Sequence, residues 1–201
     1  SIFSAPPIEL RREMAAYESL WLGQGAWFKN IAQLFAENPS RVPSELVSKL
    51  EVRDTWKRLL EEVGPERLKE VGVRVHGAGE YPAKLREADH PVELLYYRGD
   101  WELVATRGVA VVGTRSPSPE GAANAKRIAQ ALVRHKFTVV SGLARGIDSA
   151  AHAGALESGG RTIAVIGTPL LDYYPRENAA LQERLAKDHL VISQVPFLRY
   201  R

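Results

Sequence analysis

Hydrophobic and polar positions along the chain follow two different patterns. In residues 8–70, apolar positions recur every three or four residues, as in "ELRREMAAYESLWL" and "AWFKNIAQLFAENPS", a spacing typical of amphipathic helices. From residue 107 onward, short runs rich in Val and Ile alternate with helical patterns. This alternation is typical of parallel strands joined by helices. The chain is therefore predicted to hold a small helical domain, 1–70, followed by an α/β domain, 107–201.

The helical domain is expected to contain several short helices. The helix in "AWFKNIAQLFAENPS" should end at Asn38-Pro39, because the residue before a proline avoids the helical conformation. Pro43 and Asp54 are the expected starts of the next two helices, and Gly64 the expected stop. The aromatic residues of this domain recur at helical spacing, so we expect them in its core rather than on a ligand platform: Trp21, Trp27, Phe28, Phe35 and Trp56.

Residues 71–106 form a connector with two strand candidates, Val73–His76 and Glu93–Tyr97. The α/β domain should then form a Rossmann-like parallel sheet covered by helices on both faces, with strands at 107–113, 137–142, 161–167 and 189–195 and helices at about 119–135, 146–158 and 176–187. Ligands of such sheets bind outside the carboxyl ends of the strands. The loops to inspect are therefore Gly113–Gly121, Ser141–Ile147 and Gly167–Pro175.

Composition is that of a globular protein, with 45% hydrophobic and 25% charged residues. The chain has no cysteine, which excludes disulfides and thiolate chemistry and suits a reducing cytosol. No apolar run reaches the length of a membrane span, and prolines and charges interrupt the N-terminal stretch, so it is not a secretory signal. We expect a cytoplasmic protein. The first residue is not Met, which leaves open whether earlier residues were removed.

Charge is unevenly distributed between the two halves of the chain. Residues 1–100 hold 14 Lys and Arg against 16 Asp and Glu, whereas residues 101–201 hold 13 against 8. The second half thus carries about +5 and the first about −2. A basic half beside a nearly neutral one hints at a polyanionic partner.

The first loop reads "GTRSPSPEG". Gly113 permits a tight turn and a close ligand approach, while Thr114 and Ser116 offer hydroxyls and Arg115 offers planar donors suited to phosphate. The helix that follows adds a positive N-terminus. The loop matches neither the dinucleotide fingerprint nor the Walker pattern. We interpret it as a phosphate-binding loop; the alternative is a solvated turn with Arg115 directed into water.

The second loop lies in "SGLARGIDSAAH". Ser141 and Gly142 end a strand, Gly146 opens a helix, and Arg145 should reach over that helix N-terminus. In the helix, Asp148 lies four residues before a histidine and shares a face with it. The pair reads either as acid–base or metal partners, or as a brace (Asp148) with a packed His152 behind it. We favour the second reading, because no Glu/His cluster accompanies the pair. No nucleophile-elbow pattern surrounds the serine.

The third loop is "GTPLLDYYPRENAAL". Pro175 suits the first turn of a helix. Tyr173 and Tyr174 would either stack on a base, as in single-strand binders, or pack beneath the loop. Arg176 and Asn178 are candidate phosphate or base contacts.

The segments "VAVVGTRSPSPEG", "VVSGLARGIDSAAHAGALESGGRTIAVIG", "YPRENAAL" and "VISQVP" stand in the order and spacing of the DprA family (Smf, DNA-processing protein A), and the resemblance covers about 80–196. It implies an extended Rossmann fold that binds and protects single-stranded DNA, with no known catalysis and no cofactor. It also implies a homodimer that helps to load the RecA recombinase in natural transformation. By this match the DNA-contacting arginine is Arg115, and the SGLARGID pocket comprises Ser141, Gly142, Arg145, Gly146 and Asp148.

The chain departs from the family pattern in three places. Pro169 stands where the family has Gly and Asp172 is displaced by one position; Gln194 replaces an acidic residue. The family also continues through an Arg-Asn-Arg segment and further strands after the point where this chain stops at "FLRYR". We therefore expect a sheet truncated on its C-terminal side, and the sequence leaves open a piece of a longer protein or an unusually short homologue.

Two other function classes stay open at this point. Related Rossmann-like groups, lysine-decarboxylase-like or SLOG, share the two phosphate loops and act on or sense nucleotides; their Pro-Gly-Gly-x-Gly-Thr motif is absent from residues 1–201. The third class is an interaction module, for example in phage defence, in which residues 1–70 bind a partner. No metal and no membrane association are expected.

Overall fold

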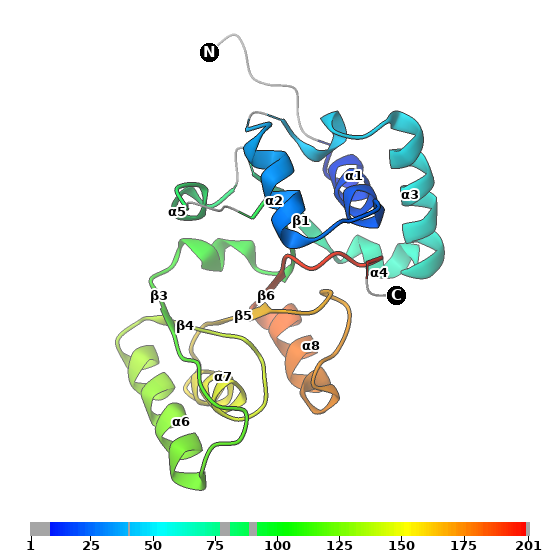
Figure 1. Ribbon diagram of the computed structural model, residues 1–201. Coiled ribbons are helices and arrows are strands. Elements are labelled where there is room, and N and C mark those ends of the chain that lie inside the picture. Colours follow the sequence, from blue (N-terminus) through cyan, green and yellow to red (C-terminus); the bar gives the residue numbers. More distant parts are fainter. Residues whose placement is uncertain (1–8, 40, 77–80, 89–91, 200–201) are drawn as a thin grey trace. The chain divides into compact units, whose positions relative to one another are not determined.

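The computed structural model describes residues 9–39, 41–76, 81–88 and 92–199 (Figure 1). The chain divides into two compact units. The first comprises Ser1–Leu95 together with Pro196–Arg201, and the second comprises Tyr96–Val195. The sequence placed boundaries at 70 and 106, whereas the division falls inside strand β2, Leu94–Gly99.

The first unit is mainly helical, as the apolar spacing predicts. Helix α1 packs against α3, and Trp21 and Leu59 are fully buried between the helices. The elements of this unit are α1 (Leu10–Leu22), α2 (Phe28–Ala36), η1 (Pro43–Glu45), α3 (Lys49–Glu62), α4 (Pro65–Lys69), β1 (Gly72–Val75) and α5 (Ala83–Arg86).

Helix α3 starts earlier than the sequence analysis predicted. Its N-cap is Ser48, whose hydroxyl accepts a hydrogen bond from Glu51 N at 3.2 Å, while the Glu51 carboxylate accepts one from Ser48 N at 2.8 Å. These bonds form a capping box and hold the pKa of Glu51 below its usual value. The predicted start at Asp54 is wrong, because the capping box begins the helix before that residue.

The aromatic residues of the first unit do not all lie in its core. Trp21 and Phe35 are buried as expected. Trp27 and Phe28, however, are 60% and 37% exposed and pack edge-on against each other, so their predicted core positions are wrong. Trp56 is half-buried. Helical spacing identifies the apolar face of a helix, but Trp27 is the N-cap of α2 and Phe28 its first residue, so the regular spacing does not yet apply to them.

Buried carboxylates hold distant segments of the first unit together. Glu13 accepts hydrogen bonds from Ser44 N at 2.9 Å and from Ser44 Oγ at 2.6 Å. Glu18 accepts from Phe197 N at 2.7 Å and Leu198 N at 3.0 Å. Backbone N–H groups thereby satisfy buried charges, and residues 197 and 198 join the first helix of the chain.

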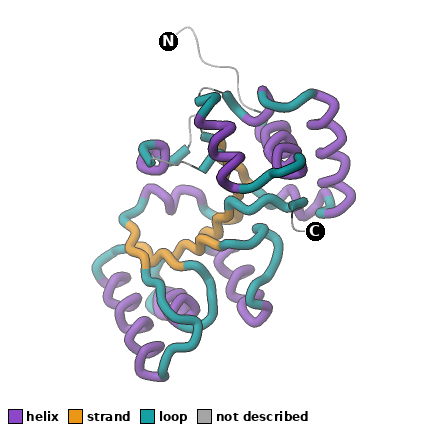
Figure 2. Tube along the Cα trace, viewed as in Figure 1, coloured by secondary structure: helices purple, strands orange, loops and turns teal. Residues whose placement is uncertain are grey.

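The second unit carries the predicted alternation of strands and helices (Figure 2). Strands β3 to β6 are parallel, and β2 pairs antiparallel with β6 through Tyr96↔Ser193, giving the order β1-β2-β6-β5-β4-β3. Both connector strands are thus sheet members. The elements are η2 (Trp101–Ala105), β3 (Gly108–Ala110), α6 (Pro119–Arg134), β4 (Thr138–Ser141), α7 (Ile147–Glu157), β5 (Thr162–Ile166), η3 (Arg176–Asn178), α8 (Ala179–Asp188) and β6 (Leu190–Ser193).

Helices α6, α7 and α8 lie on the same side of the parallel strands (Figure 1). From β3 to β6, each parallel strand is added on the same side of the strand before it. Right-handed crossovers between such strands place every connecting helix on one face of the sheet. On the other face of β5, Val165 is 50% exposed. At this position of β5, helices within the described residues therefore cover one face and not both, contrary to the sequence prediction.

Helices α6 and α7 approach closely through small residues. A Cβ on Gly154 would lie 2.6 Å from the Lys126 carbonyl oxygen of α6. Ala129, Ala151 and Ala155 pack with Val139 of β4 in a shared core. The small-residue run after the second loop thus lets α7 lie against both the sheet and its neighbour. No helix among the described residues combines the length and apolar character that crossing a membrane requires.

Candidate functional site

The three candidate loops follow adjacent parallel strands. β3, β4 and β5 are neighbours in the sheet, so their carboxyl ends meet at one edge. The first loop links β3 to α6, the second links β4 to α7, and the third links β5 to the turn η3.

The first and second loops are locked together at Gly146. Ile147 N donates a hydrogen bond to the Thr114 carbonyl oxygen at 3.2 Å. Gly146 has φ 77° and ψ −121°, a conformation that side chains disfavour, and a Cβ there would lie 2.5 Å from that same oxygen. On the opposite side of the contact, a Cβ on Gly113 would lie 2.7 Å from Ile147 Cγ1. Both glycines are therefore required by contact between the loops.

Ser141 connects the ends of two strands. Its hydroxyl donates to the Val111 carbonyl oxygen at 2.6 Å, and the residue is 2% exposed. In the first loop, Thr114 Oγ1 accepts from Ser116 N at 3.2 Å, and Ser118 Oγ accepts from Gly121 N at 3.1 Å as the cap of α6. These hydroxyls hold the loops in shape.

Asp148 braces the second loop. It is 6% exposed, and its Oδ2 accepts from Gly142 N at 3.0 Å and from Ala144 N at 3.3 Å. A Cβ on Gly142 would lie 2.7 Å from the same oxygen, so a larger residue there would displace the carboxylate from these hydrogen bonds. The carboxylate also lies in the first turn of α7, where the helix dipole favours a negative charge.

His152 lies in the core, away from the loop surface. It is fully buried, with Nδ1 2.7 Å from Thr162 Oγ1. Because the Thr162 hydroxyl donates to the Val139 carbonyl oxygen at 2.9 Å, Nδ1–H is the donor to Thr162. Burial, with a smaller contribution from His189, lowers the pKa of His152 to about 4. Asp148 and His152 thus have separate partners, which favours the brace-and-packing reading over an acid–base pair.

The third loop is fastened to the second by Asn178. Its amide nitrogen donates to the Leu143 carbonyl oxygen at 2.8 Å and to Ser149 Oγ at 2.9 Å. Both amide hydrogens are therefore used within the protein, so Asn178 supports the site instead of offering these donors to a ligand. Sequence reasoning missed Gln182, whose amide donates to the carbonyl oxygens of Leu170 and Asp172 at 3.0 and 3.1 Å. Only its place on a helix following the loop could have indicated this role.

The groups left at the surface are cations and an aromatic ring. Arg115 and Arg176 are exposed, and Tyr174 is 59% exposed. Arg145 Nε lies 3.1 Å from Glu177 Oε1, an exposed ion pair that the sequence analysis did not foresee. Planar guanidinium donors recognise phosphate and an open ring stacks on bases. The loops therefore present the chemistry that nucleic-acid binding uses.

Comparison with known proteins assigns the chain to a family through residues 72–199. The model of the DNA recombination-mediator protein A family matches residues 72–199. The DNA processing protein DprA of Streptococcus pneumoniae is 49% identical over 115 residues, which is 57% of this chain and 40% of that protein. Protein Smf of Synechocystis is 44% identical over 121 residues, 58% of this chain and 30% of that protein.

Solved structures agree with the fold. The X-ray structure of S. pneumoniae DprA has a TM-score of 0.61 and 32% identity, covering 91% of this chain and 62% of that one. A structure of DNA processing protein A from Helicobacter pylori, described for its single-stranded DNA binding mode, has a TM-score of 0.56 and 28% identity over 64% of this chain and 57% of that one. By sequence, the chain spans 40% of the length of S. pneumoniae DprA and 30% of the length of Synechocystis Smf.

Proposed function

Because this chain belongs to the DNA recombination-mediator protein A family, we propose that it binds single-stranded DNA along the edge formed by its three loops, without catalysis and without a cofactor. The observation that carries the proposal is the linked loop system. Hydrogen bonds join all three loops, and the groups they leave exposed include the arginines and the tyrosine of the site: Arg115, Arg145, Tyr174 and Arg176. Such a rigid edge would bind a phosphate backbone with little loss of loop entropy.

Arg115, Arg145 and Tyr174 have separate roles in this proposal. Arg115 has no ion pair among the described residues and takes a phosphate with its planar donors. Arg145 exchanges the Glu177 carboxylate for a second phosphate, a substitution favoured by the weak energy of an exposed pair. Tyr174 stacks on a base. Asp148 and Asn178 fix the loops that hold these groups.

The wider role rests on the family. We propose that the protein protects single-stranded DNA and assists the loading of the RecA recombinase during DNA uptake, acting as a homodimer. The exposed apolar side chains of Val112 and Val165 support self-association. The lack of cysteine suits the reducing cytoplasm, where the protein would bind single-stranded DNA.

The test is the affinity for labelled oligo-dT, measured by fluorescence anisotropy across a salt series. Arg115→Ala should weaken binding and make the slope of log K against log salt shallower by about 0.7, the value for one phosphate on a single strand. Arg134→Ala is the matched control. It removes an equally exposed cation from the far end of α6, which starts directly after the first loop.

Two outcomes would contradict the proposal. Equal affinity of Arg115→Ala and the parent protein would remove the first loop from the interface. A nucleoside monophosphate that raises the melting temperature more than oligo-dT does would favour the nucleotide-binding alternative.

A further inference from the structure

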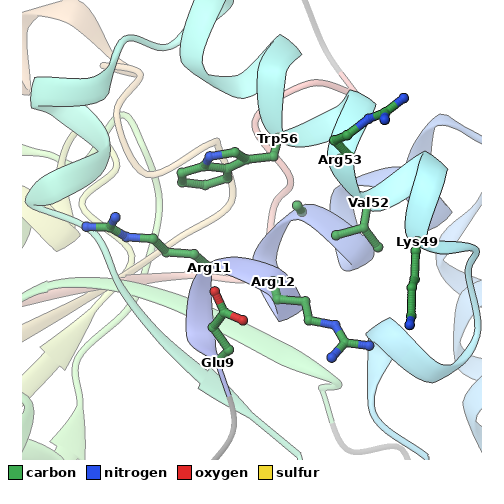
Figure 3. A pocket seen from close by; sticks show the side chains of 8 residues that line it. Glu9, Arg11, Arg12, Lys49, Val52, Arg53 and Trp56 are labelled. Carbon is green, nitrogen blue, oxygen red and sulfur yellow. The ribbon is translucent and has the colours of Figure 1, made fainter.

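The first unit holds a basic pocket between α1 and α3 that the three loops do not use. Its volume is about 440 Å³, which lies in the range of small-ligand sites. The pocket is lined by Glu9, Arg11, Arg12, Ala15, Lys49, Val52, Arg53 and Trp56 (Figure 3).

Unpaired cations gather at this pocket. No ion pair joins Arg11, Arg12 or Lys49 to an acid within the described part of the chain. In Figure 3, Arg12 and Lys49 extend toward the same side of the pocket, whereas Arg53 points away. Among the described residues, Arg53 is the lining cation that pairs with an acid: its Nε lies 3.2 Å from Asp54 Oδ1.

Three acids close to this pocket bond to groups other than Arg11, Arg12 and Lys49. Glu13 is buried and bonded to Ser44, and Glu51 is held in the capping box of α3. Asp54 is taken by Arg53, which leaves Glu9 as the acid of the lining. Arg11 and Arg12 lie in the first turn of α1, and Lys49 lies in the first turn of α3. The positive ends of two helix dipoles therefore add to the charge of the side chains.

Trp56 supplies an aromatic wall on the opposite side from Lys49. It is half-buried and lies on the same face of α3 as Lys49 and Val52, which precede it by seven and four residues. In Figure 3 its ring lies on the same side of the pocket as Arg11. Cations and an aromatic ring are the two elements with which proteins hold a nucleotide of a single strand: charge for the phosphate and a ring for the base. An acidic peptide would use the cations but has no base to offer the ring.

We propose that this pocket is a second contact for single-stranded nucleic acid, in which Arg12 and Lys49 hold a phosphate and Trp56 stacks on a base. The inference rests on the proposed function, and it adds a nucleic-acid contact in the helical unit to the contacts proposed for the second unit. It also explains why unpaired cations cluster in a half of the chain whose net charge is about −2.

The test uses the full chain and labelled oligo-dT, with an abasic strand of the same length for comparison. The double variant Arg12→Ala/Lys49→Ala should weaken binding of both strands and reduce the salt slope by about 0.7 for each phosphate lost. Trp56→Leu keeps an apolar side chain of helical propensity but has no ring. It should weaken oligo-dT binding roughly fivefold or more and leave the abasic strand unaffected.

The matched control is Lys29→Ala/Lys57→Ala, which removes two exposed cations of the same unit that do not line the pocket. Binding by this control should equal that of the parent. If the pocket variants also bind like the parent while Arg115→Ala does not, the second contact is refuted and the proposed function stands. If Arg115→Ala binds normally and the pocket variants do not, the loop edge is refuted as the binding site and the pocket stands as a contact for single-stranded nucleic acid. Displacement of oligo-dT by polyglutamate at equal charge concentration would assign the pocket to acidic peptides instead.

Discussion

The buried imidazole of His152 makes the stability of the second unit depend on pH. Its pKa is about 4 in the folded chain, against about 6.5 in an unfolded one. The unfolded state therefore binds the proton first as the pH falls. The stabilisation is complete above pH 6.5 and is lost progressively as the pH drops from 6.5 through 4. The difference between the two pKa values corresponds to about 3 kcal/mol of unfolding free energy.

The measurement is urea unfolding at several pH values from 4 to 8, for the parent and for His152→Asn. Asparagine retains a donor near the Nδ1 position, which bonds Thr162, but does not titrate. Other groups, including His189, whose pKa burial also lowers, remain in both proteins. Their contribution cancels in the difference. The parent should lose about 3 kcal/mol more than the variant between pH 7 and pH 4. Parallel pH curves would show that His152 is not held neutral by burial, and the reasoning would fail.

Two further substitutions test the contacts that shape the molecule. Gly146→Ala places a Cβ 2.5 Å from the Thr114 carbonyl oxygen at positive φ. Backbone strain alone should lower the free energy of unfolding by roughly 1–3 kcal/mol. A urea midpoint equal to that of the parent would contradict the locked-loop description. Glu18→Gln leaves one of two buried N–H groups facing an amide donor. It should cost about 1–3 kcal/mol and speed hydrogen exchange at Phe197 and Leu198, and unchanged exchange there would refute the anchor.

The α/β half could be predicted closely because its signals are local. Strand β4 lies within the predicted 137–142, and α6 starts at the predicted residue 119. Continuous Val and Ile runs bounded by glycines fix such elements without knowledge of the rest of the chain. The capping box of α3 was equally local, with Ser48 and Glu51 three residues apart, and was readable from the sequence.

The contents of the site needed the three-dimensional structure. Asn178 and Leu143 are 35 residues apart, and nothing near either residue shows that one holds the other. The pairing of Arg145 with Glu177 has the same character. The basic pocket depends on α1 lying against α3. Residue types can suggest a phosphate loop, but which donors stay free depends on contacts across the sequence.

The Glu18 anchor has a consequence for the order in which the chain folds during synthesis. Its carboxylate and Phe197 N are 179 residues apart, so at about 5–20 residues per second the anchor waits roughly 10 to 40 seconds for its partner. Folding of the second unit shortens that search. Pairing of Tyr96 with Ser193 brings residues 95 and 196 close together, which replaces a very long loop closure by a short one. The helical unit, although translated first, is therefore completed only after the second unit.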